Sequence, residues 1–319
     1  MTPEAFQDLV HPYRRELAAY CYRMLGSLAD AEDQVQETLL SAWRGIDGFE
    51  GRASVRSWLY RIATNGCLDV LRRRPRRETP EAHGPPADPR APLGTPDREL
   101  LWIEPAPATL WEGAPASPEA SFSARESVQL AFVVALHHLP AAQRAVLILR
   151  EVVGWSAAEV AALLDTTVAS VNSALQRARA TLDARRARPA ATPASPALVE
   201  RYVAAWESGD VAALAALLRE DVVATMPPYA AWFLGREALR TFIAARIGAP
   251  GAKRVVRAQG ADELVLALYR RPADAPDGPH QAQAIQVVHT AGDLVAQLHM
   301  FLDPALVARF GLPPQLIDR

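Results

Sequence analysis

The sequence predicts a multidomain protein with two all-α domains, the second a helix-turn-helix, joined by an extended linker and followed by an α+β domain. Residues 1–77 and 122–188 carry apolar side chains at helical spacing. Residues 78–121 contain ten prolines, a density that neither a helix nor a sheet tolerates. From residue 197 onward, helical patterns give way to strand-like runs, which indicates a third domain of the α+β class.

Composition limits the class of protein. The 319 residues are 50% hydrophobic and carry a formal net charge of −2, which allows two or three domains with buried cores. Cys21 and Cys67 lack the spacing of a metal site and are too few for a disulfide framework. The N-terminus has no signal-peptide core, and no apolar run reaches the ~18 residues of a membrane span. We therefore expect a cytoplasmic protein with no metal and no cofactor.

The first domain, residues 1–77, opens with two helices. An apolar stripe runs from Leu9 to Met24, and Gly26 is placed to end this helix. Asp30 is a candidate N-cap of the next helix, with Asp33 completing an approximate capping box. That helix should bury one stripe, namely Val35, Leu39, Ala42 and Ile46. Its acidic outer face is either a protein-docking surface or a solvated helix start whose acids favour the helix dipole.

The strongest local signal is the basic stretch from Phe49 to Arg77. Its eight arginines face only two acids, although the whole chain is nearly neutral, which indicates a polyanion bound at one place. Its helix should bury Val55, Trp58, Leu59, Ile62, Gly66 and Val70. Arg61, Asn65 and Arg72 fall on the opposite face, with Trp58 at its margin. Such a face suits phosphates and an unstacked base, or else it is a solvated arginine face on an ordinary core helix.

Residues 30–74 resemble the second conserved region of bacterial sigma-70 family RNA polymerase sigma factors of the extracytoplasmic-function (ECF) group. The resemblance implies that the acidic helix docks on the clamp helices of the largest subunit of RNA polymerase core through Asp30, Glu32, Asp33, Gln36, Glu37, Leu40 and Trp43. It also implies that residues 49–54 form a pocket for a base flipped from the −10 promoter element, and that Asn65 reads a base. The implied −10 contacts are Phe49, Arg52, Ser54, Arg56, Trp58, Arg61, Asn65 and Arg72.

The linker, residues 78–121, reverses the charge of the stretch before it. It carries eight acidic residues against Arg90 and Arg98. It is either a solvated spacer or, as the family resemblance implies, a chain that threads the RNA exit channel of the polymerase. Trp102 and Trp111 are unusual in a plain spacer and are candidate anchors. The WIEP sequence, residues 102–105, resembles that of a subgroup whose members carry an extra C-terminal domain.

The second domain, residues 122–188, predicts three helices and a helix-turn-helix. Helices over residues 126–139 and 140–153 precede Gly154. Ser156 and Glu159 form a capping box that opens a short helix ending at Leu164. After a turn, a longer helix over residues 168–186 should bury Val171, Leu175, Ala178 and Leu182.

The outer face of that last helix carries Ser170, Asn172, Ser173, Gln176 and Arg177. Small polar, amide and guanidinium groups there can reach base edges in a major groove, whereas the alternative is a plain three-helix bundle. Residues 139–182 resemble the fourth conserved region of the same sigma family, which binds the −35 element. Many relatives have basic residues where Asn172 and Ala174 stand, so the −35 sequence read by this chain stays open.

The third domain, residues 197–319, follows a short flexible joint. Two helices precede strand-like runs over residues 222–226, 255–259, 264–269, 284–289 and 294–302, with a helix over 236–247. Residues 198–243 resemble the SnoaL-like, NTF2-like cone fold, whose members include isomerases and cyclases that use an Asp and a His. The candidates to line such a cavity are Asp221, Tyr229, Trp232, His289 and His299. Catalysis, ligand sensing and regulatory docking all stay open for this domain.

We therefore predict a sigma factor that directs core RNA polymerase to specific promoters and aids promoter melting, with no catalytic centre of its own. The resemblance implies that the C-terminal domain regulates this activity in cis, through a small-molecule ligand in the cone or by docking. One alternative is a cone-fold isomerase or cyclase with a DNA-binding appendage. Another is a helix-turn-helix repressor, which would bind duplex DNA tightly without polymerase.

Overall fold

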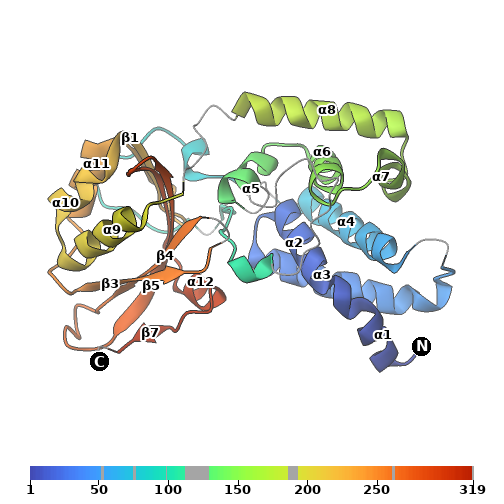
Figure 1. Cartoon of the computed structure of the whole chain (residues 1–319), viewed down its shortest axis with the longest axis horizontal. Coiled ribbons are helices and arrows are strands. Elements are labelled where there is room, and N and C mark those ends of the chain that lie inside the picture. Colours follow the sequence, from blue (N-terminus) through green and yellow to red (C-terminus); the bar gives the residue numbers. More distant parts are fainter. Residues whose placement is uncertain are drawn as a thin grey trace. The chain divides into compact units, whose positions relative to one another are not determined.

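The computed structural model describes residues 1–51, 54–74, 77–97, 99–111, 129–185, 193–260 and 263–317. The chain divides into two compact units (Figure 1). The first unit combines Met1–Glu78 with Ile103–Arg188, and the second combines Thr79–Trp102 with Pro189–Arg319. The proline-rich linker is therefore shared between the two units. Among the described residues, no helix is both long and apolar enough to cross a bilayer.

Four helices form the beginning of the first unit, namely α1 (Pro3–Val10), α2 (Arg14–Leu25), α3 (Leu28–Gly45) and α4 (Val55–Arg73). The long first helix predicted from the apolar stripe is broken by a 3-10 turn at His11–Tyr13, because Pro12 lacks the N–H that an α-helix needs there. Gly26 ends α2 with a φ of 73°, which confirms the predicted C-cap. The stripe predicted on α3 is buried. The predicted cap is wrong, because Ser27 Oγ, not Asp30, accepts the hydrogen bond at the start of α3.

Helix α4 buries a face different from the predicted one. Its buried residues are Leu59, Tyr60, Ala63, Thr64 and Cys67, of which the prediction contained only Leu59. Thr64 is fully buried because its hydroxyl pairs with Tyr20 Oη at 2.8 Å. Helix α4 contacts α2 and α3 on one side and the second helical domain on the other, so more of its circumference is covered than a single apolar stripe indicates.

The second helical domain comprises α5 (Leu130–His137), α6 (Ala141–Leu147), a π-helical turn (Ile148–Val152), α7 (Ala157–Leu163) and α8 (Val168–Arg185). The predicted start of the first of these helices lies outside the described residues. The capping box is confirmed, with Ser156 N donating to Glu159 Oε2 at 2.7 Å and Glu159 N donating to Ser156 Oγ at 3.2 Å. The four residues predicted to face inward from α8 are buried. Short helix, turn and long helix thus have the predicted helix-turn-helix order.

The second unit is an α+β domain around a seven-stranded sheet (Figure 1). Its helices are α9 (Pro196–Ser208), α10 (Val211–Ala216), α11 (Arg236–Ala244) and α12 (Pro304–Arg309). Its strands are β1 (Leu218–Thr225), β2 (Trp232–Leu234), β3 (Lys253–Ala258), β4 (Leu264–Arg270), β5 (His280–Ala291), β6 (Leu294–Phe301) and β7 (Gln315–Leu316). The order is β2-β1-β6-β5-β4-β3, with β7 beside β5 and β1 parallel to β6. One face of the sheet packs against α9, α10 and α11 in a single apolar core.

The linker folds onto the second unit along part of its length. Ala87 N donates to Trp232 O at 2.8 Å, and Asp97 N donates to Pro228 O at 3.0 Å. The indole of Trp232 in turn donates to Gly84 O at 2.9 Å. Only short 3-10 turns, at Pro80–Ala82 and Ala108–Leu110, interrupt the irregular backbone of the described linker. Residues 84–97 are therefore an ordered strap against the C-terminal domain.

Candidate polymerase and nucleic-acid interfaces

The outer face of α3 is the candidate protein-docking surface. Glu32, Asp33, Gln36 and Glu37 are all exposed along it. Leu40 and Trp43 continue the same face with exposed fractions of 46% and 37%, high for large apolar side chains. An acidic helical face with two exposed hydrophobic residues at one end is suited to a basic partner with an apolar pocket.

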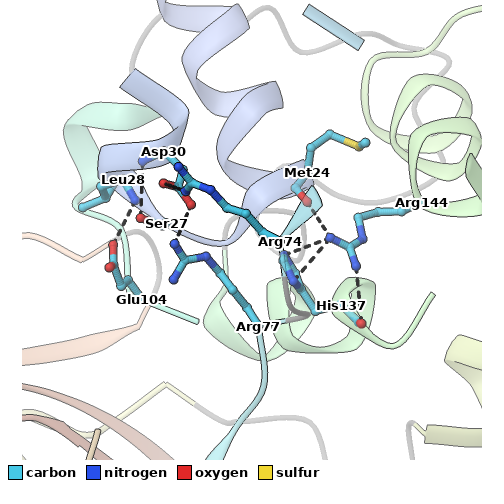
Figure 2. Close-up of polar contacts among 9 residues, drawn as sticks. All are labelled: Met24, Ser27, Leu28, Asp30, Arg74, Arg77, Glu104, His137 and Arg144. Atoms are coloured by element: carbon cyan, nitrogen blue, oxygen red, sulfur yellow. Dashed lines mark hydrogen bonds and ion pairs between the residues drawn. The ribbon is translucent and has the colours of Figure 1, made fainter. Parts of the chain in front are cut away.

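Asp30 differs from the other acids on α3, because the chain itself already pairs its carboxylate (Figure 2). Arg74 Nη1 lies 2.7 Å from Oδ1 and Arg77 Nη2 lies 2.5 Å from Oδ2. Burial alone would raise the pKa of Asp30, but the two guanidinium groups outweigh it and hold that pKa below its usual range. The side chain is only 15% exposed. The other six residues predicted to contact polymerase are exposed, whereas Asp30 is largely covered.

Helix α4 presents the candidate −10 surface. Phe49 and Trp58 stack with ring centroids 4.6 Å apart and planes 26° apart. Arg61 and Asn65 are exposed on the same helix, three and seven residues after Trp58, a spacing that puts them on the same side of the helix as Trp58. A stacked aromatic pair next to a cation and an amide can hold an unstacked base and its phosphate. The structure thus pairs Phe49 with Trp58, and helical spacing puts Arg61 and Asn65 on the same side of α4 as Trp58.

The other predicted −10 residues have different surroundings. Ser54 caps α4, its Oγ accepting a hydrogen bond from Ser57 N at 3.1 Å. Arg72 is exposed at the end of the helix and is paired with Asp69. Arg52 lies outside the described residues.

Arg56 is partly buried and is held by contacts within the first unit. Its Nε lies 3.0 Å from both carboxylate oxygens of Glu16, and its Nη2 lies 2.9 Å from Oε2. Glu16 is only 7% exposed, and the guanidinium also lies over the rings of Tyr60 and Trp155. Trp155 belongs to the second helical domain, so Arg56 bridges the two helical domains. No local pattern predicts this ion pair, because Glu16 is 40 residues away from Arg56 along the chain.

Helix α8 exposes the residues predicted for −35 binding. Ser170, Asn172, Ser173, Gln176 and Arg177 are all exposed on it. The helix is anchored from its other side, where Arg179 Nη2 lies 2.6 Å from the buried carboxylate of Glu151. A long helix with an exposed polar face after a tight turn can enter a major groove.

Two polar residues that sequence analysis did not single out join the linker and the second helical domain to the α2–α3 junction (Figure 2). Glu104 Oε2 accepts from Leu28 N at 3.0 Å, where α3 begins, and Glu104 N donates to Gly26 O at 2.9 Å. Arg144 from α6 is 3% exposed and donates to Met24 O at 2.5 Å. A carboxylate at a helix N-terminus and a cation at a helix C-terminus each complement the helix dipole. Arg144 belongs to no local motif, and Glu104 lies in the WIEP sequence, from which no contact with α3 was predicted.

The residues predicted to line a cone cavity do not form one cluster. Asp221 is exposed and paired with Arg219 at 2.7 Å. Trp232 and Tyr229 lie on or beside β2, where the linker strap docks. His289 and His299 do come together, with ring centroids 5.4 Å apart.

The two histidines share a polar network on the sheet. His289 contacts Glu263 Oε1 at 2.8 Å, and both rings contact Gln297 Oε1. Burial lowers the pKa of His289, but Glu263 and Gln297 raise it by more. Strand alternation places this network on the face opposite the apolar core that packs against the helices.

Comparison with known proteins gives a consistent result along the chain. Residues 9–77 match Sigma-70 region 2, residues 129–182 match Sigma-70 region 4, and residues 199–298 match the SnoaL-like domain. The chain is 44% identical to the ECF RNA polymerase sigma factor SigG of Mycobacterium tuberculosis, over 98% of this chain and 85% of SigG. It is 33% identical to SigM of the same organism, over 56% of this chain and 75% of SigM. The crystal structure of the M. tuberculosis ECF sigma factor SigJ matches 98% of this chain and 100% of SigJ, with a TM-score of 0.57 and 23% identity.

Proposed function

Because the chain belongs to the ECF group of RNA polymerase sigma factors, we propose that each of its exposed helical faces has one task in promoter recognition. The acidic face of α3, with Leu40 and Trp43, binds the clamp helices of core polymerase. The Phe49–Trp58 stack with Arg61 and Asn65 captures the −10 element. The exposed face of α8 reads the −35 element. The observation that carries the assignment is the aromatic stack lying beside an exposed cation and an exposed amide on α4.

We propose further that the C-terminal domain regulates this activity in cis through the linker. The strap over residues 84–97 makes hydrogen bonds to Trp232 and Pro228 in that domain. Arg246 Nη2 adds a contact to Ala91 O at 2.9 Å. A strap held in this way cannot at the same time lie extended in an RNA exit channel. Polymerase therefore has to draw the linker away from the C-terminal domain.

Run-off transcription with purified core polymerase tests the −10 assignment. Arg61→Ala with Asn65→Ala should abolish open-complex formation while polymerase binding stays intact, because both side chains lie on α4 and away from α3. Each lost base-directed contact is expected to cost ~1–3 kcal/mol. Glu200→Ala in the C-terminal domain is the matched control. A double variant that melts promoters normally, or one that no longer binds polymerase, would contradict the assignment.

The same assay tests the other two tasks. Gln176→Ala and Arg177→Ala should weaken −35 recognition, and unchanged promoter choice would argue against groove entry by α8. Trp232→Phe keeps the aromatic ring but removes the hydrogen bond to Gly84 O, so it should shift promoter output in the same direction as deletion of residues 197–319. Identical output from the full chain, Trp232→Phe and the truncated chain would refute regulation through the strap.

A further inference from the structure

Helix α8 begins at Val168, a large apolar residue that is 45% exposed. Ala169, which follows it, is exposed as well. A single exposed valine is ordinary on a protein surface, but this one lies at the start of the long helix of a helix-turn-helix. The first residues of that helix are the ones that contact base edges when it enters a major groove. The chemistry of these residues therefore bears on which bases α8 can distinguish.

The first two turns of α8, residues 168–175, contain no charged side chain. Guanine is contacted most often by arginine or lysine, and cytosine by an acidic side chain, so these turns can make neither contact. The exposed groups that remain are the apolar Val168 and Ala169, the amide of Asn172 and the hydroxyls of two serines. An amide pairs with adenine, and an apolar group contacts the methyl group of thymine. This part of the helix is therefore suited to A·T base pairs.

The hydroxyl groups at the start of α8 hold each other and the helix backbone. Ser170 N donates to Thr167 Oγ1 at 3.1 Å, and Thr167 Oγ1 donates to Ser170 Oγ at 2.9 Å. Thr167 thus acts as the N-cap of the helix, a role that fixes its side chain. The first turn is left with Val168 and Ala169 as its apolar exposed surface.

We propose that Val168 is a specificity-determining residue of this sigma factor, and that its side chain contacts the C5 methyl group of a thymine in the −35 element. The inference rests on the proposed entry of α8 into the major groove, and it names the base group that the first turn of the helix recognises. Val168 is not among the residues predicted for −35 binding, because all of those residues carry polar side chains.

Asn172 determines where that thymine should lie relative to its neighbours. Val168 and Asn172 are four residues apart on one side of the helix, which puts their Cβ atoms about 5–6 Å apart. Base pairs follow one another every ~3.4 Å along the duplex. The thymine contacted by Val168 should therefore lie one or two base pairs from an adenine that is bound by the Asn172 amide.

The charged side chains of α8 lie further along the helix. Arg177 is exposed, whereas Arg179 is paired with the buried carboxylate of Glu151. A cation held against a phosphate contributes affinity that falls with salt, whereas a methyl contact carries sequence information and no charge. Val168 should therefore affect the choice of base without changing the salt dependence of promoter binding.

The test is binding of the full chain with core polymerase to promoter duplexes selected from a pool that is randomised over the −35 region. Each −35 thymine of a selected duplex is replaced in turn by deoxyuridine, which lacks only the C5 methyl group. One such replacement should weaken binding about fourfold, as expected for one buried methyl group. In Val168→Ala the same replacement should cost less than about 1.5-fold, because both changes remove the same contact. The variant should fold normally, since alanine is the better helix former.

Two controls separate base recognition from a general effect on binding. The slope of affinity against salt should be the same in Val168→Ala and in the unmodified chain, whereas Arg177→Ala should lower it by about one. Ile317→Ala removes an exposed β-branched side chain from the C-terminal domain and should keep the full deoxyuridine penalty.

Two results would overturn the inference. One is a −35 preference that survives replacement of every thymine by deoxyuridine. The other is an unchanged deoxyuridine penalty in Val168→Ala, which would assign the methyl contact to another residue. Selected promoters with no preferred −35 sequence would instead contradict the proposed groove entry of α8, and this inference with it, so the two failures are distinguishable.

Discussion

Arg56, near the N-terminal end of α4, is either a DNA contact or part of an internal ion pair. Its replacement by methionine distinguishes these two roles. The family resemblance implies a DNA contact, whereas the structure pairs the guanidinium with the nearly buried carboxylate of Glu16. Breaking a fully buried ion pair by removing one partner costs about 3–5 kcal/mol. Arg56 is 30% exposed, so solvent screening reduces this figure to about 2 kcal/mol. Loss of the contacts with the Tyr60 and Trp155 rings adds about 0.5–1 kcal/mol.

The expected loss for Arg56→Met is therefore about 2.5–3 kcal/mol in the local stability of α2 and α4. Amide hydrogen exchange in peptides from these helices should accelerate by about 60- to 140-fold, since each 1.4 kcal/mol is a factor of ten. Arg61→Met is the matched control: it removes an exposed arginine from the same helix and should change stability by less than about 0.5 kcal/mol. Glu16→Gln keeps an acceptor for Arg56 and should fall between the two. If Arg56→Met left exchange unchanged while abolishing promoter melting, Arg56 would be a DNA contact and the structural reasoning would be wrong.

Three further outcomes can be checked on the full chain. Burial raises the pKa of Glu104, so its contribution to the stability of the docked segment should be full below the ordinary carboxyl pKa of 4.5 and should fall as pH rises through the raised pKa. In Glu104→Gln, thermal midpoints measured upward from pH 4.5 should lose this dependence. Gly26→Ala should cost about 1–3 kcal/mol in urea unfolding, because φ is 73° and a Cβ would meet the His137 ring at 2.7 Å, whereas an exposed Gly251→Ala strains only its own backbone. Ser156→Ala should destabilise α7 by about 1 kcal/mol, and equal exchange rates in α7 would contradict the capping box.

Periodicity predicted the parts of the fold in which one face of a helix meets one neighbour. The stripes ending at Ile46 on α3 and at Leu182 on α8 are buried as expected, because each of these helices has a polar face left to solvent. Periodicity did not predict the buried face of α4, because this helix packs against α2 and α3 and also against α6 and α7. As a result, Thr64 and Cys67 are core residues of α4, although a prediction based on the spacing of apolar side chains does not select them.

Contacts between distant segments account for the rest of what the sequence could not predict. The parallel pairing of β1 with β6 joins strands about 70 residues apart, so no local pattern encodes it. Strands β2 and β7 have three and two residues, too few for alternation to be recognised. The linker was predicted as an extended segment from its prolines, and its backbone is largely irregular. Its docking depends on single hydrogen bonds such as that from Trp232 to Gly84 O, which composition does not reveal.

The candidate sites show the same contrast between features that helical periodicity predicts and features that depend on contacts between distant segments. Exposure of the polar face of α8 follows from the helix period alone, so all five predicted residues lie on it. The cavity residues were chosen by residue type and by resemblance, and neither says which side chains share one face of the sheet. In the structure His289 and His299 lie together on the face opposite the helices.

The pairing of Asp30 bears on the proposed binding of polymerase by the acidic face of α3. A carboxylate already held by Arg74 and Arg77 must give up these two partners before it can gain new ones, so exchange of one ion pair for another yields little net free energy. Asp33 and Glu37 are exposed, and binding costs them mainly solvation and side-chain entropy. The same two arginines would be released from α3 if a basic partner captured Asp30. Engagement of this end of the helix is therefore coupled to the segment that leads into the linker, whereas engagement of the rest of the face is not.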